Sequence, residues 1–291
     1  MGFEIIVAKK SSFCPGVKRA VRIAREILSK ENPPVYSTGP LIHNPQFVAK
    51  LKTEGLLVLE ELPKNSELLR GLTLITRSHG IDRETHKSIT DAGARVIDAT
   101  CPKVKRVQKA AGELVRDGYS LIILGSPEHP EVRAIASRAS KNALIFSNAS
   151  EATKWFESEG KKAGKVGVVC QTTVAPEVLD EFSEFLKNGK FEIVIRDTIC
   201  EDVRQRIKEA EKICKNADVM IVVGGKNSSN TKSLTSICST YTRTYHVERP
   251  SEIKPSWFKE ARKVGVTGGA STPSEAIEET TSILREISKN L

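Results

Sequence analysis

The chain has 291 residues, and its 39% hydrophobic and 28% charged residues are the composition of an ordinary globular protein. No apolar stretch is long enough to cross a membrane, the N-terminus lacks the pattern of a secretory signal, and six cysteines are too few for a disulfide scaffold, so we expect a cytoplasmic protein without a membrane partner. The formal net charge of +9 indicates an anionic partner, and because the basic residues are dispersed and only 5% of residues are aromatic, a phosphorylated small molecule or an acidic protein fits as well as nucleic acid.

Short apolar runs alternate with longer amphipathic stretches along the whole chain. This alternation predicts parallel sheets covered by helices, and runs such as LIILG and MIVVGG are typical of strands buried on both faces. The predicted strands are 4–8, 35–38, 73–77, 94–98, 120–124, 166–170, 192–196, 219–223 and 263–267. The predicted helices are 16–30, 45–54, 82–92, 103–117, 130–139, 175–187, 201–215, 231–240 and 273–288.

Three cysteines, Cys14, Cys101 and Cys200, each follow a short apolar run and divide the chain into near-equal thirds. In each third the cysteine is followed by an apolar run ending in glycine, then a polar loop, and later by another apolar run with a second polar loop. This internal repeat predicts three pseudo-threefold-related α/β lobes with mainly parallel sheets. The expected lobe boundaries are 1–97, 98–196 and 197–291.

The polar loops all fall at the ends of predicted strands. In open α/β sheets ligands gather beyond the carboxyl ends of the strands, so we expect the loops of the three lobes to face one centre. The repeat-equivalent residues are His43, His129 and Ser228 in the first loops, and His79, Thr172 and Ser271 in the second.

One cysteine from each lobe would supply three thiolates to one site. Structural zinc normally takes four protein ligands, whereas three thiolates suit an iron–sulfur cluster in which one iron keeps no protein ligand and can bind a substrate oxygen. The alternative of three unrelated core cysteines is disfavoured by their matched positions. The other cysteines, Cys170, Cys214 and Cys238, are predicted to be buried small hydrophobic residues.

Three loops have alternative interpretations. Glu131 follows His129 across Pro130, where a carboxyl near a metal could donate a proton, although glutamate is also favoured in the first turn of any helix. The KNSSNTKSL and GGASTPSEAI loops offer hydroxyls, an amide and helix N–H groups to an anion, or they cap the helices that follow. His43 and His79 could add donors to phosphate oxygens. The anion-loop residues are Ser228, Ser229, Asn230 and Ser271.

Over essentially its whole length the chain resembles the 4-hydroxy-3-methylbut-2-enyl diphosphate reductase family. The motifs that carry the resemblance are FCPGVKRAV, GPLIHNPQ, RSHGI, DATCPKV, EHPEV, QTT, DTIC, GGKNSSNT and GVTGGASTP. The resemblance implies three lobes around a 4Fe–4S cluster held by Cys14, Cys101 and Cys200, with the allylic hydroxyl of the substrate on the open iron. It implies reductive dehydroxylation to isopentenyl and dimethylallyl diphosphate, the last step of the methylerythritol phosphate pathway, with electrons from ferredoxin or flavodoxin and no nucleic-acid partner.

The resemblance also assigns roles to individual residues. The catalytic residues would be Glu131 as proton donor, with His129 and Thr172 beside it. The diphosphate would be held by His43, His79, His129, Ser228, Ser229, Asn230 and Ser271, with Thr172 near the hydroxyl. Two departures stand out: Ser12 replaces a frequent glycine, and Val203 replaces a threonine in a segment that keeps Arg206. That threonine lies near the cluster in the family, so the resemblance implies that its replacement affects the tuning of the cluster.

Two other functions remain open from the sequence. Another three-cysteine iron–sulfur enzyme, such as a quinolinate synthase, would share the cluster but not the predicted diphosphate loops. A basic nucleic-acid-binding protein with a structural metal would account for the net charge of +9, and it would bind nucleic acid with a steep dependence on salt.

Overall fold

The computed structural model describes residues 2–31, 34–63, 65–139, 143–159, 164–187 and 192–291. The chain forms two compact units, which we describe separately. The first unit combines residues 1–18, 42–50 and 201–291, and the second combines 19–41 and 51–200. Among the described residues, no helix has the length and apolar character needed to cross a membrane.

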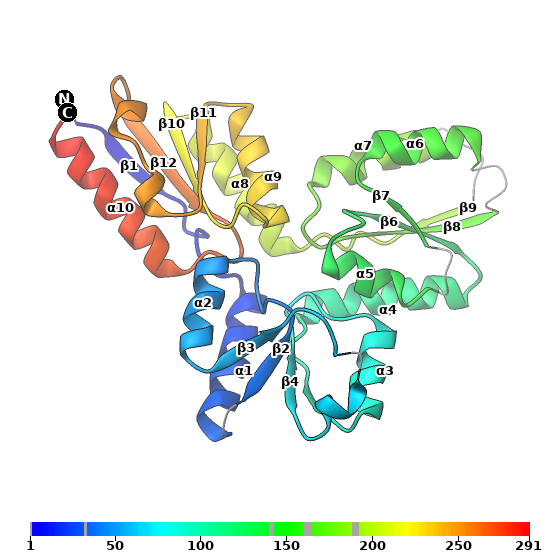
Figure 1. Cartoon of the computed structure of the whole chain (residues 1–291). Helices are drawn as coiled ribbons and strands as arrows, with labels where there is room; N and C mark the ends of the chain where they lie inside the picture. The colour runs from blue at the N-terminus through cyan, green and yellow to red at the C-terminus, as the bar shows by residue number, and fades with distance from the viewer. Residues whose placement is uncertain (1, 32–33, 64, 140–142, 160–163, 188–191) are drawn as a thin grey trace. The chain divides into compact units, whose positions relative to one another are not determined.

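The first unit contains one parallel four-stranded sheet in the order β1-β12-β10-β11 (Figure 1). Val219, Ile221 and Val223 of β10 share a buried cluster with Ile277 and Leu284 of α10, because alternate residues of a strand face the same side. The strands are β1 (Glu4–Val7), β10 (Val219–Val223), β11 (Arg243–Val247) and β12 (Lys263–Gly268). The helices are α8 (Glu201–Cys214), α9 (Ser229–Ser239) and α10 (Ser274–Lys289), with short 3-10 turns at Pro250–Glu252 and Pro255–Phe258.

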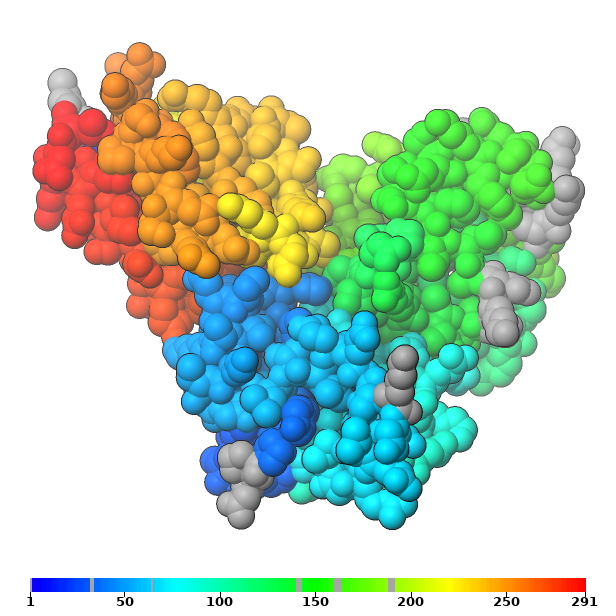
Figure 2. Space-filling view, viewed as in Figure 1, coloured from blue at the N-terminus to red at the C-terminus, as the bar shows by residue number. Residues whose placement is uncertain are grey.

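The opposite side of this sheet is packed against α8. A side chain added at Gly265 would come within 2.5 Å of both Ile213 and Met220, so the helix sits close to the strand. Segment Ile42–Lys50 also belongs to this unit: Lys50 pairs with Glu275 of α10 at 3.5 Å, and Gln46 donates to the carbonyl of Glu248 at 3.0 Å. In the space-filling view this blue segment adjoins the red and orange surface of the C-terminal part (Figure 2).

The second unit contains two parallel four-stranded sheets, in the orders β3-β2-β4-β5 and β7-β6-β8-β9 (Figure 1). The strands of the first are β2 (Val35–Thr38), β3 (Leu56–Leu59), β4 (Thr73–Thr76) and β5 (Arg95–Ile97). Those of the second are β6 (Ser120–Leu124), β7 (Leu144–Phe146), β8 (Lys165–Cys170) and β9 (Glu192–Ile195). The helices of this unit are α3 (Arg83–Asp91), α4 (Pro102–Arg116), α5 (Pro130–Ala136), α6 (Ala149–Ser158) and α7 (Pro176–Lys187), with a 3-10 turn at Ser66–Leu69. Helices α1 (Pro15–Lys30) and α2 (Pro45–Thr53) begin in the first unit and end in the second.

The sheet of β6–β9 is covered on both faces. Ile122 and Leu124 share a cluster with Phe156 and Phe182 of α6 and α7, whereas Ile123 lies in a second cluster formed with α4 and α5. Burial of both faces explains why these strands read as continuous apolar runs. The prediction of three parallel α/β lobes is confirmed.

The three sheets repeat one strand order. In each, the edge strand that precedes a cysteine pairs with the strand that precedes the second polar loop: β1 with β12, β5 with β4, and β9 with β8. The predicted third 1–97 therefore gives its first strand to the sheet of the last third, where β1 pairs with β12 at the edge opposite β11. The lobe boundaries 1–97, 98–196 and 197–291 stay a prediction.

Candidate functional site

The three repeat cysteines have equivalent backbone positions. Each one directly precedes a helix, and its N–H donates to a carbonyl in the second polar loop of its own sheet. The distances are 3.0 Å from Cys14 to Ala270, 2.9 Å from Cys101 to Ser78, and 2.9 Å from Cys200 to Thr172. The repeat inferred from the sequence is therefore also a repeat of local hydrogen bonding.

The thiols lie where a helix N-terminus supplies N–H donors. The sulfur of Cys14 accepts from the N–H of Val17 at 3.4 Å in the first unit. In the second unit, burial raises the pKa of Cys101, the N–H groups of Lys103 and Val104 lower it, and the nearby Cys200 and Glu131 raise it further. Because burial raises its pKa, Cys101 is not an activated free thiol, and a thiolate here would need a neighbouring positive charge to offset its burial.

Glu131 is a buried carboxyl held by one neighbour. It lies in the first turn of α5 with 1% exposure, and Thr172, which follows β8, donates its N–H to Oε1 at 2.6 Å and its hydroxyl to Oε2 at 2.8 Å. Burial raises the pKa of Glu131 from 4.5 to about 7, although both Thr172 hydrogen bonds lower it. The group can therefore be protonated or ionised near neutral pH, as a proton donor requires.

His129 precedes Glu131 and caps the same helix. Its Nδ1 accepts from the N–H of Glu131 at 3.2 Å, so the neutral ring carries its proton on Nε2, which suits it to donate to an oxyanion. The ring of His79 lies edge-on to that of His129, with 5.2 Å between the centroids. The second unit therefore brings His79, His129, Glu131 and Thr172 into neighbouring loops.

The first unit gathers the predicted anion loops. Ser228 caps α9 by accepting from the N–H of Thr231 at 3.3 Å, and Asn230 accepts from the N–H of Ala270 at 2.8 Å. Asn230 is only 3% exposed, and its Nδ2 donor has no hydrogen-bond partner among the described residues. Because an unpaired buried donor is costly, this amide indicates an acceptor that the protein itself does not supply.

The loops of His43 and Ser271 also lie in the first unit and are joined by a hydrogen bond. The residue after His43 is Asn44, whose side-chain amide donates to the carbonyl of Ser271 at 3.1 Å. Gly224 holds the loop of Ser228 close: its φ is +153°, and an added side chain would approach Thr231 to 2.7 Å. Among the predicted site residues, the first unit contains Cys14, His43, Ser228, Ser229, Asn230 and Ser271, and the second contains Cys101, Cys200, His79, His129, Glu131 and Thr172.

Two supporting residues were not singled out from the sequence. Asn44 connects the His43 loop to Ser271, as above. Gln171, 2% exposed, accepts from the N–H of Ser126 at 3.1 Å and donates to the hydroxyl of Thr173 at 2.7 Å, so it joins the Glu131 and Thr172 loops. Asn44 lies in the motif GPLIHNPQ and Gln171 in the motif QTT, each beside a residue that was identified from the sequence. Their place in these motifs was the available signal.

The remaining cysteines are buried, as predicted: Cys170, Cys214 and Cys238 are at most 2% exposed. All six cysteines lie among the described residues, and none forms a disulfide. Val203 stands where the family that the sequence resembles has a threonine. It is buried on α8, with 3% of its surface exposed.

The comparisons with known proteins agree with one another. The family described as LytB protein matches residues 5–285. A curated "4-hydroxy-3-methylbut-2-enyl diphosphate reductase" of Geobacter metallireducens is 41% identical over 286 residues, covering 98% of each chain, and one of Aquifex aeolicus is 39% identical over 285 residues, covering 98% of this chain and 96% of its own.

Two solved structures are similar over nearly the whole chain. One is an (E)-4-hydroxy-3-methyl-but-2-enyl diphosphate reductase, described as the terminal enzyme of the non-mevalonate pathway. It has 36% identity and a TM-score of 0.69, and the match covers 98% of this chain and 100% of that one. The other is the E-1-hydroxy-2-methyl-but-2-enyl-4-diphosphate reductase of Plasmodium falciparum, with 26% identity and a TM-score of 0.89, covering 97% and 88% respectively.

Proposed function

Because the chain belongs to the LytB family, we propose that it removes the hydroxyl group of (E)-4-hydroxy-3-methylbut-2-enyl diphosphate by reduction. The C–O bond breaks, the oxygen leaves as water, and two electrons and two protons are consumed. Protonation at one or the other end of the resulting allyl group gives isopentenyl or dimethylallyl diphosphate. The observation that carries the proposal is the buried Glu131 carboxyl, whose pKa of about 7 is matched to proton donation.

The cofactor we propose is a 4Fe–4S cluster held by Cys14, Cys101 and Cys200. Its fit is supported by the donor set: three thiols at equivalent strand ends, with N–H groups of the following helix directed at the sulfurs of Cys14 and Cys101. When bound, such a cluster supplies electrons and an open iron that acts as a Lewis acid on the leaving hydroxyl.

Glu131 would supply a proton to the departing oxygen. Near pH 7 about half of the molecules carry a proton on this carboxyl, as follows from its pKa. Once the proton has left, the N–H and hydroxyl of Thr172 stabilise the carboxylate through hydrogen bonds of 2.6 and 2.8 Å. Catalysis would then be greatest when the acid form is present.

The diphosphate would be bound by the polar loops at the sheet ends. Asn230 supports this role most directly, because its buried Nδ2 needs an acceptor. The N-terminus of α9 adds backbone N–H groups and positive dipole charge, both of which favour phosphate. The full set that we propose is His43, His79, His129, Ser228, Ser229, Asn230 and Ser271.

The electrons must come from outside the chain, and we propose an acidic donor protein such as ferredoxin or flavodoxin. A groove of about 680 Å³ in the second unit is lined by five basic side chains and one acidic one, Asp98. The basic residues are Arg83, Lys105, Lys109, Arg116 and Arg138. Lys105, Lys109 and Arg116 lie on one face of α4, and this helix begins at the residue after Cys101, so a partner docked there would contact the helix that follows a proposed cluster ligand.

Turnover of the named substrate tests the proposal. The protein is purified without oxygen and given a chemically reduced dye and (E)-4-hydroxy-3-methylbut-2-enyl diphosphate, and the products are separated by mass. Isopentenyl and dimethylallyl diphosphate are expected, with two electrons used per molecule. Iron-loaded protein that leaves the substrate unchanged would overturn the function. Glu131→Gln should lose this activity, and Glu128→Gln is its control. Glu128 is exposed in the loop that leads to Glu131, where it pairs with Arg133 at 2.5 Å.

A further inference from the structure

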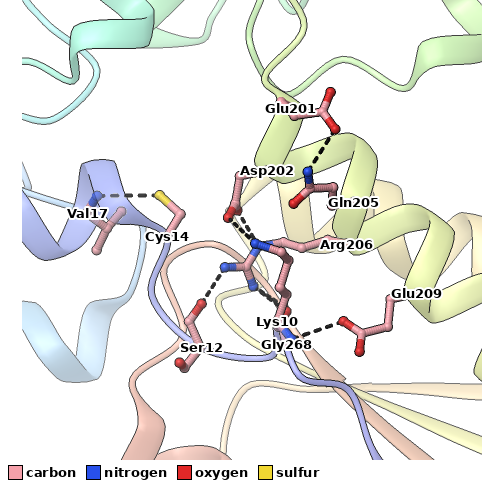
Figure 3. A network of polar contacts seen from close by, with 10 residues as sticks. All are labelled: Lys10, Ser12, Cys14, Val17, Glu201, Asp202, Gln205, Arg206, Glu209 and Gly268. Atoms are coloured by element: carbon pink, nitrogen blue, oxygen red, sulfur yellow. Dashed lines mark hydrogen bonds and ion pairs between the residues drawn. The ribbon is translucent and has the colours of Figure 1, made fainter.

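The segment leading to Cys14 is held by one face of α8 (Figure 3). Glu209 accepts the N–H of Lys9 at 2.7 Å and of Lys10 at 3.0 Å. Arg206 donates to the carbonyl of Lys10 at 2.6 Å and to that of Ser12 at 2.5 Å. Four backbone groups ahead of the cysteine are therefore fixed by two side chains one turn apart on the same helix.

Arg206 is a buried cation with a partly exposed counter-ion, Asp202. It is 2% exposed, its Nε donates to Asp202 at 2.7 Å, and Asp202 also lies 3.6 Å from the ammonium of Lys10. Its Nη1 donates further to the carbonyl of Gly268 at 3.1 Å, where β12 ends. One guanidinium thus joins three segments, and its planar fork can make all these bonds at once, which a lysine cannot.

The position of these bonds along the chain connects them to the proposed cluster ligands. Helix α8 begins at the residue after Cys200, and the loop after Gly268 contains Ala270, whose carbonyl accepts the N–H of Cys14. We propose that Arg206 and Asp202 are positioning residues that fix Cys14 against α8 and so hold its sulfur in place for the cluster. This inference rests on the proposed function only in taking Cys14 as a cluster ligand.

The physical reason is the cost of leaving buried polar groups without their charged donor. Without Arg206, Asp202 keeps a charge with 13% of its side chain exposed, and the carbonyls of Lys10, Ser12 and Gly268 lose a charged donor. The segment from Lys9 to Cys14 then relaxes toward water, and the sulfur of Cys14 loses its fixed position. The expected consequence is a looser cluster in a chain that is still folded.

Two variants test this, with an exposed residue of the same helix as the control. Arg206→Lys keeps the charge and loses the fork, Asp202→Asn removes the counter-charge, and Lys208→Met removes an exposed charge from the same helix. Without oxygen, release of iron to a chelator is expected to be about tenfold faster in Arg206→Lys, with a changed electron paramagnetic resonance spectrum of the cluster. Asp202→Asn should show the same change to a smaller degree, and Lys208→Met should match the unmodified protein.

A second measurement does not need the cluster. In iron-free protein, hydrogen exchange of the amides of residues 9–14 is expected to be about tenfold faster in Arg206→Lys, while exchange in β10 stays unchanged. If iron release, spectrum and exchange in Arg206→Lys all equal those of the unmodified protein, the positioning role is wrong. This result is distinct from failure of the proposed function, in which the unmodified protein binds iron but does not convert the substrate.

Discussion

Replacing Glu131 by glutamine should remove the proton donor and leave the rest of the site in place. The side chain keeps its size, and its one amide oxygen can still accept one of the two hydrogen bonds that Thr172 donates to the carboxyl. Glutamine carries no acidic proton, so we expect turnover to fall by about 10²–10⁴-fold, the usual contribution of a general acid. The Michaelis constant for substrate should change little, because Glu131 is not among the proposed diphosphate ligands.

Burial sets the size of the pH effect. A carboxyl with an ordinary pKa of 4.5 is only about 0.3% protonated at pH 7, whereas Glu131 with its pKa of about 7 is about half protonated, a gain of roughly a hundredfold. Turnover should therefore be flat below pH 7 and fall about tenfold per pH unit above it. Because the folded pKa is raised, Glu131 favours folding most below pH 4.5, and this contribution of about 3 kcal/mol is lost as pH rises through 7.

The assay is the pH profile of turnover with a chemically reduced dye, for the unmodified protein, Glu131→Gln and the exposed control Glu128→Gln. Denaturant unfolding of the three proteins from pH 4.5 to 8 measures how the free energy of unfolding depends on pH. Glu131→Gln should lack the part of this dependence that comes from Glu131. Full turnover in Glu131→Gln, or an unchanged decline above pH 7 in that variant, would refute the assignment of the proton to Glu131.

Two further predictions concern binding, and a third concerns the pKa of Glu131. Asn230→Ala should raise the Michaelis constant for substrate by about 10–100-fold, as loss of a hydrogen bond to a charged group implies. Asn227→Ala, at an exposed residue of the same loop, should leave it unchanged. If Asn230→Ala and the unmodified protein have the same Michaelis constant, Asn230 does not bind the diphosphate. Lys109→Glu and Arg116→Glu should raise the Michaelis constant for an acidic donor protein by about tenfold and leave dye-driven turnover unchanged; no effect at low salt would move docking away from this groove. Thr172→Val should raise the pKa read from the pH profile, because it removes the hydroxyl that stabilises the ionised carboxyl; a lowered pKa would contradict the contact.

Local sequence patterns predicted much of the fold, but missed one edge strand of each sheet. The nine predicted strands are all present, whereas β3, β7 and β11 were not predicted. Two of these have three or four residues, and RTYHV in β11 mixes polar with apolar residues because the strand lies at a sheet edge and is only partly buried. Helix α6 was also missed. The three strands occupy equivalent places in the repeat, so comparison of the three thirds could have found them.

The contacts of the site could not be predicted because they join residues far apart in sequence. Glu131 and Thr172 are 41 residues apart, and each was identified separately, but their two hydrogen bonds and the resulting pKa depend on the packing of β6 against β8. Arg206 was noted only as a retained arginine. Its acceptors at Lys10 and Ser12 lie 196 and 194 residues away, brought near by the pairing of β1 with β12.

The iron and sulfide content of protein purified without oxygen tests the central claim most directly. The account predicts about four irons and four sulfides per chain, lost in Cys14→Ser, Cys101→Ser and Cys200→Ser and kept in the buried control Cys170→Ala. An iron-free protein after anaerobic reconstitution, or equal iron in Cys14→Ser and Cys170→Ala, would contradict the claim that these three thiols hold one cluster.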